Sequence, residues 1–80
     1  MNTFYFYILA VLDIQSVGFE NGAVIVTIKG INTGQFLAAA KKGSEVFLTT
    51  NHGDNIRWRL EVDNKTYQDR YKNTITGFVS

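Results

Sequence analysis

The stretch that most constrains the fold is residues 26–43, VTIKGINTGQFLAAAKKG. An apolar, β-branched run at 24–28 leads into an Asn-Thr-Gly turn at 32–34, and a second apolar run at 36–40 leads out of it. Two apolar runs around such a turn predict a β-hairpin or a sharp corner between two strands. A short helix over the second run is the alternative, because Leu, Ala and Lys favour helices and Gly43 would suit a helix end. We favour the strand.

Part of this stretch recurs near the end of the sequence. Residues 33–38, TGQFLA, are echoed by residues 76–80, TGFVS, and 43 residues separate Gly34 from Gly77. A repeat of this length indicates structural units that bury their apolar face only against one another. We therefore expect one full unit over about 34–76 and part of another before it.

Composition limits the classes of protein to consider. Eighty residues make a single domain, here 1–80, and 45% hydrophobic residues argue against disorder. The net charge is +1, and the basic residues are scattered among the acidic ones along the chain. Because a nucleic-acid binder clusters its basic residues, we expect no nucleic-acid partner. The absence of cysteine excludes a disulfide scaffold and a thiolate metal site.

The first half of the chain also predicts strands. Residues 3–12 are aromatic and β-branched, as in a buried strand. They also have the apolar character of a signal peptide, although no basic side chain precedes them. Ten residues are too few to span a bilayer, so we expect no membrane insertion. Residues 13–17 continue the strand, and the loop at 18–22 contains Asn21-Gly22, a strong hairpin-turn signal.

The second half alternates strands with polar turns. The clearest alternation is at 56–62, where Ile56, Trp58, Leu60 and Val62 are expected to face the core. Further strands are expected at 46–50, 66–67 and 75–79, with turns at 51–55 and 63–65 and a loop or edge at 68–73. The fold class predicted is all-β and antiparallel. The expected core comprises Leu12, Ile14, Val26, Ile28, Phe36, Leu37, Ile56, Trp58 and Leu60.

Residues with catalytic potential are few and dispersed. His52 is the one histidine and lies in a turn, and no hydrolase, phosphate-loop or zinc-protease motif is present. We expect no enzyme activity, no metal site and no cofactor. Lys41 and Lys42 are candidate anion-binding residues, although two lysines at a turn are more typical of a solvated tip. Asn64-Lys65-Thr66 is an N-glycosylation sequence in an expected surface turn.

Four segments in order, LDIQSV, GAVIVTIKGINTGQFLAAAKKG, WRLEVDNKTY and YKNTITGFV, resemble the fibroblast growth factor family over roughly residues 9–79. The IKG-INTG-FLA-KKG portion is the most specific. The resemblance implies an incomplete β-trefoil, with about two of three repeats, and an extracellular ligand of a cell-surface receptor. Asn64 and Tyr67 fall on or beside positions that contact the receptor in that family. Incompleteness further leads us to expect self-association, because an unpaired strand edge invites pairing with another chain.

The sequence departs from that family in several places. Residues 18–25 hold extra residues, Ala39-Ala40 replace the usual Met-Asn, and the usual cysteine before the RLE strand is missing. The family's C-terminal third, which carries most of its heparan-sulfate-binding residues, has no counterpart, so glycosaminoglycan binding is doubtful. The Leu-Ala-Ala and Trp-Arg-Leu-Glu segments also resemble the actin-bundling fascins, and the Thr-Gly-Phe and Trp pattern is similar to ricin-B-type lectins. The alternative function is therefore a carbohydrate-binding or actin-binding trefoil module.

Overall fold

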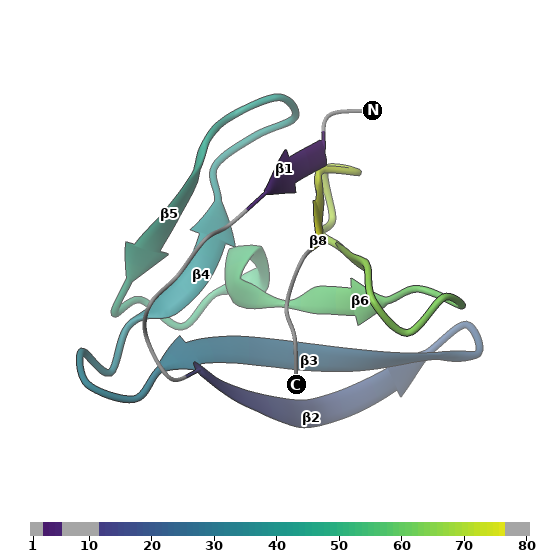
Figure 1. Cartoon of the computed structure of the whole chain (residues 1–80), viewed down its shortest axis with the longest axis horizontal. Coiled ribbons are helices and arrows are strands. Elements are labelled where there is room, and N and C mark those ends of the chain that lie inside the picture. Colours follow the sequence, from purple (N-terminus) through teal and green to yellow (C-terminus); the bar gives the residue numbers. More distant parts are fainter. Residues whose placement is uncertain (1–2, 6–11, 77–80) are drawn as a thin grey trace.

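The computed structural model describes residues 3–5 and 12–76 and shows an all-β protein (Figure 1). The described residues contain one 3₁₀ turn, Asp54–Ile56, and no α-helix. None of them forms a helix with the length and apolar character needed to cross a membrane. The strands are β1 (Thr3–Tyr5), β2 (Leu12–Glu20), β3 (Ala23–Gly30), β4 (Phe36–Ala39), β5 (Val46–Thr49), β6 (Trp58–Leu60), β7 (Tyr67–Gln68) and β8 (Thr74–Thr76).

These strands form one curled sheet that closes about half of a barrel. Its order is β1-β8-β7-β6-β3-β4-β5, and β2 pairs with β3 outside this path. Every pair is antiparallel except β1 with β8, which is parallel. The long strand β3 is central, since it pairs with β2 along its whole length and with both β4 and β6. The all-β, mainly antiparallel prediction is confirmed.

The β2–β3 hairpin turns at Asn21 and Gly22, as the sequence predicts. Asn21 has φ 49° and Gly22 has φ 79°. A two-residue hairpin turn with positive φ at both positions matches the right-handed twist of its strands, and Asn-Gly tolerates that conformation best. The predicted loop at 18–22 is nevertheless wrong in extent, because β2 continues to Glu20 across a register shift between Ser16 and Gly18.

The stretch at 26–43 forms a corner between β3 and β4. Gly34, at φ 69°, donates its N–H to the Gly30 carbonyl at 2.8 Å, and the Gly30 N–H bonds Gln35 O at 2.9 Å. Beyond this turn the two strands share only the Lys29–Phe36 pair, and β4 then pairs with β5 over four residues. The strand predicted at 36–40 is confirmed, and the helical alternative is wrong.

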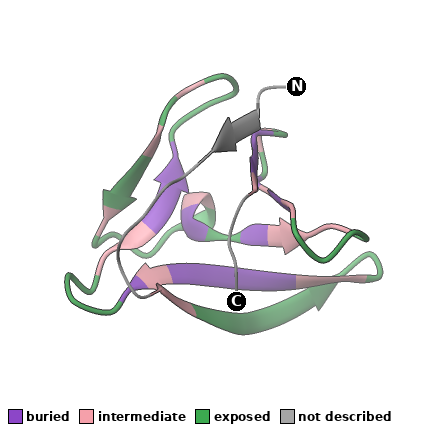
Figure 2. Ribbon diagram, in the orientation of Figure 1, coloured by how far each residue is buried: buried purple, intermediate pink, exposed green. Residues whose placement is uncertain are grey.

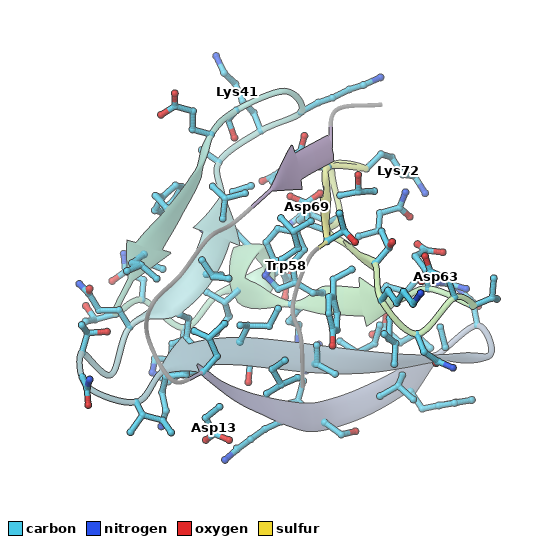
Figure 3. All side chains as sticks on the ribbon, viewed as in Figure 1. Asp13, Lys41, Trp58, Asp63, Asp69 and Lys72 are labelled. Atoms are coloured by element: carbon cyan, nitrogen blue, oxygen red, sulfur yellow. The ribbon has the colours of Figure 1, made fainter. Side chains whose placement is uncertain are left out.

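The core lies on the concave face of the sheet around Trp58 (Figures 2 and 3). Trp58 is fully buried, and its indole N–H donates to Leu37 O at 3.0 Å. That bond satisfies the polar atom of the largest core side chain and joins β6 to β4. The central cluster consists of Val26, Ile28, Leu37, Trp58, Tyr67 and Ile75.

Two predicted core residues are on the surface. Ile14 is 39% exposed because β2, which pairs only with β3 among the described strands, lies outside the barrel (Figure 2). Val62 is 100% exposed because β6 ends at Leu60, so the alternation stops before residue 62. Phe36, Leu12 and Leu60 are only partly buried.

The strand predicted at 56–62 is correct only over 58–60. Ile56 ends the 3₁₀ turn instead, yet it is 5% exposed, so its side chain still enters the core. The turn at 63–65 and the strand that follows it agree with the prediction. Predictions for residues 6–11 and 77–80, including the second copy of the repeat after Thr76, lie outside the described residues.

Candidate functional site

The Lys41–Lys42 tip between β4 and β5 is anchored to a distant turn. Asn73 is 1% exposed, and its side chain accepts a hydrogen bond from Gly43 N–H at 2.8 Å and donates one to Lys41 O at 2.8 Å. Ser44 Oγ adds bonds with Ala40 N–H and with the N–H and carbonyl of Lys41. Both lysines are exposed, and Figure 3 shows Lys41 pointing away from the molecule. The tip therefore presents two cations on a fixed backbone.

The turn between β6 and β7, residues 61–66, is organised by Asp63. Its carboxylate accepts hydrogen bonds from the N–H groups of Lys65 and Thr66, both at 2.9 Å, and from the Thr66 hydroxyl at 2.7 Å. These bonds, led by that from Lys65 N–H, hold the pKa of Asp63 below its usual 3.8. The main chain adds Glu61 N–H to Thr66 O and Asn64 N–H to Glu61 O.

The two residues predicted to contact a receptor lie in different environments. Asn64 is exposed at φ 59°, in the left-handed conformation that Asn tolerates. Tyr67 is 9% exposed and belongs to the core, where burial raises the pKa of its phenol. Of the pair, only Asn64 has an exposed side chain. It borders a shallow hollow of about 200 Å³ whose rim includes the exposed Val62.

The structure also gathers residues that no sequence motif connects. A hollow of about 430 Å³ is lined by all three arginines of the chain, Arg57, Arg59 and Arg70. We call this site the arginine hollow. Its other lining residues come from three strands, from the 3₁₀ turn and from the turn after β7, and they are Glu20, Ile25, Asp54, Gln68, Asp69 and Lys72. Sequence reasoning missed it because the arginines look scattered along the chain. The only local signal is that Arg57 and Arg59 flank the inward-pointing Trp58.

Side chains of the types that bind metal ions do not cluster among the described residues. These residues contain no group of three or more His, Cys, Asp or Glu side chains placed to hold a metal ion. His52 is exposed, and its ring meets the edge of Phe36 at 5.0 Å between centroids. The geometry at His52 is that of a surface aromatic contact.

Comparison of the chain with models of known protein families, with curated proteins and with solved structures gives no match.

Proposed function

We propose that this protein is a non-catalytic binding module that follows the β-trefoil plan and acts as a growth factor-like ligand of a cell-surface receptor. The trefoil plan is supported by the unit from β3 to β6. In it, β3 and β6 pair antiparallel through Ile25–Arg59 and Val26–Trp58. The β4–β5 hairpin extends between them in sequence. A repeat of such a fold is one supersecondary unit that buries its apolar face only against its neighbours, and the segment from β3 to β6 has the form of such a unit.

The proposal depends mainly on two tips of the molecule, residues 41–43 and the turn at 61–66, which are held in place by hydrogen bonds and face solvent. Residues 41–43 are fastened by Asn73, and the 61–66 turn is fastened by Asp63. Both tips come from the segments that carry the resemblance. Loops already held in one conformation lose less entropy on binding, so a rigid sheet with fixed tips suits recognition.

The 61–66 turn supplies the better contact surface of the two. Val62 is fully exposed there, next to the exposed side chains of Asn64 and Lys65. An exposed apolar side chain rimmed by polar groups is typical of a protein contact site. We propose that Asn64 contacts the receptor directly, and that Tyr67 supports the turn from the core.

The test is binding of the intact chain to a panel of immobilised receptor ectodomains, compared with the Asn64→Gly variant. Glycine keeps the positive φ and removes only the side chain, so the fold should be retained. We expect roughly tenfold weaker binding for Asn64→Gly, in the range of a moderate interface residue. Asn51→Gly, which also removes an exposed Asn side chain from a connecting loop, is the matched control and should bind as the native chain does.

A glycan array and an actin co-sedimentation assay address the alternative trefoil functions. A clear signal in either one, with no receptor bound in the panel, would replace the growth factor-like proposal by a lectin-like or actin-binding one.

A further inference from the structure

We infer that the arginine hollow is a binding site for an acidic peptide segment of a protein partner. Four basic side chains line it, Arg57, Arg59, Arg70 and Lys72, together with three acidic ones. Its volume of about 430 Å³ falls within the range of sites that hold small ligands or a few side chains. Arginine guanidinium groups match a carboxylate through two parallel hydrogen bonds, which makes this residue the usual partner of acidic side chains at interfaces.

The floor of the hollow is set by strand register. Arg59 on β6 pairs with Ile25 of β3 on one side and with Gln68 of β7 on the other. The three residues therefore form one row across the sheet, and neighbours in such a row lie about 5 Å apart. Arg59 Nη2 donates to Asn21 O at 3.1 Å, which leaves the other guanidinium N–H groups available.

The wall formed by the turn after β7 is rigid. The buried Asp69 carboxylate accepts hydrogen bonds from the N–H groups of Tyr71 at 2.9 Å and Asn73 at 2.8 Å, and from the Asn73 amide at 3.1 Å. The three hydrogen bonds to this carboxylate all come from its own turn, and none comes from an arginine. Figure 3 shows Asp69 and Lys72 on this part of the molecule.

The remaining acidic residues hold the arginines only loosely. Arg57 lies 4.0 Å from Glu20 and Arg70 lies 3.5 Å from Asp54, and the four side chains are 45–73% exposed. Exposed pairs of this kind contribute little free energy, so a carboxylate of a ligand can replace them at small cost. Arg59 and Lys72 have no carboxylate partner among the described residues.

The charge balance favours a peptide carboxylate over a polyanion. Four basic and three acidic lining residues leave a single formal positive charge, which matches one carboxylate. A sulfated polysaccharide or a nucleic acid needs a wide basic surface and would be repelled by Glu20 and Asp54 at this site. The inference rests on the proposed function only in taking the partner to be a protein.

The experiment is a titration of the ¹⁵N-labelled full chain with a short peptide holding one glutamate among glycine and serine. We expect amide shift changes confined to the residues of the hollow, binding that weakens as salt rises, and no binding of the glutamine version of the peptide. Arg59→Gln should weaken binding about tenfold or more, since it removes a charge-assisted contact. Arg59→Lys should bind the peptide with an affinity between those of the native chain and Arg59→Gln, because lysine keeps the charge without the planar guanidinium group.

Lys29→Gln is the matched control, because it removes one positive charge from a half-buried side chain of β3 that does not line the hollow. It should bind the glutamate peptide as the native chain does. The amide shift changes of the native chain locate the binding site even if a variant does not fold. Tighter binding of a sulfated hexasaccharide or of a phosphoserine peptide would overturn the inference, as would equal binding of the glutamine peptide or no shift at up to ~10 mM peptide. Peptide binding in a chain that binds no receptor would refute the proposed function alone.

Discussion

Single polar side chains decide the shape of both exposed tips. Asp63 closes the 61–66 turn by accepting three hydrogen bonds, and Asn73 reaches Gly43 and Lys41 across 30 or more positions of sequence. Each bond is modest in free energy, yet together they remove the alternative conformations that a surface turn would otherwise sample. The tips are consequently part of the folded framework.

The Asp63 hydrogen bonds predict a specific pH dependence. They lower the pKa of this carboxyl below 3.8, so the stabilisation is fully present above pH 3.8 and is lost as the pH falls through the folded-state pKa. We expect Asp63→Asn to reduce the free energy of unfolding at pH 6, and the difference from the native chain to shrink towards pH 2.5. Urea unfolding at both pH values measures this. Glu45→Gln is the control, because the Glu45 carboxylate has no hydrogen bond among the described residues. If the difference between Asp63→Asn and the native chain stayed unchanged at low pH, the stabilising role of the Asp63 hydrogen bonds would be contradicted.

At the scale of elements, the β4–β5 tip and the turn before β8 behave as one unit through Asn73. Replacement of this buried side chain by alanine removes the side-chain partner of Gly43 N–H and one of the hydrogen bonds to Lys41 O, and it opens space beside Asp69. We expect Asn73→Ala to lower the free energy of unfolding by about 2–4 kcal/mol. Chemical denaturation measures the change.

Asn51→Ala is the control for that substitution. It removes the same atoms from an exposed loop and should change the free energy of unfolding by less than ~0.5 kcal/mol. Equal effects of the two substitutions would show that the link between the tip and the turn contributes nothing to stability.

At the scale of the whole molecule, the half-closed sheet predicts self-association. β2 is exposed along most of its length, with Phe19 70% and Val17 41% exposed, and its outer edge pairs with no described strand (Figure 2). An exposed apolar edge strand is a template for pairing with another chain. We expect sedimentation at micromolar concentration to show species larger than a monomer.

Phe19→Lys should shift that equilibrium towards the monomer, because a charged edge strand resists pairing. Val62→Lys, which replaces a fully exposed apolar side chain outside the strands, should leave it unchanged. A monodisperse, cooperatively melting native monomer would refute self-association and would mean that the sheet closes its core within one chain.

Local chemistry was sufficient to predict the strands, the Asn21–Gly22 turn and the burial of Trp58. These features depend on neighbouring residues: alternation sets which side chains share a face, and Asn-Gly suits the positive φ of a hairpin turn. The extra length of β2 and the early end of β6 escaped prediction, because strand ends depend on which other strand is available to pair. For the same reason, Ile14 and Val62 face solvent, although both fit the apolar alternation of the sequence.

The sequence by itself therefore determined the β class, the main turns and the exposed character of Lys41, Lys42 and Asn64. Only the tertiary structure decided that Tyr67 is a core residue, that Asn73 holds the Lys41–Lys42 tip, and that three arginines share one hollow. The physical reason is that each of these depends on contacts between segments far apart in the sequence. Strand register brings Arg59 beside Gln68, and a side-chain hydrogen bond joins Asn73 to the backbone of Lys41. No pattern within a single segment contains that information.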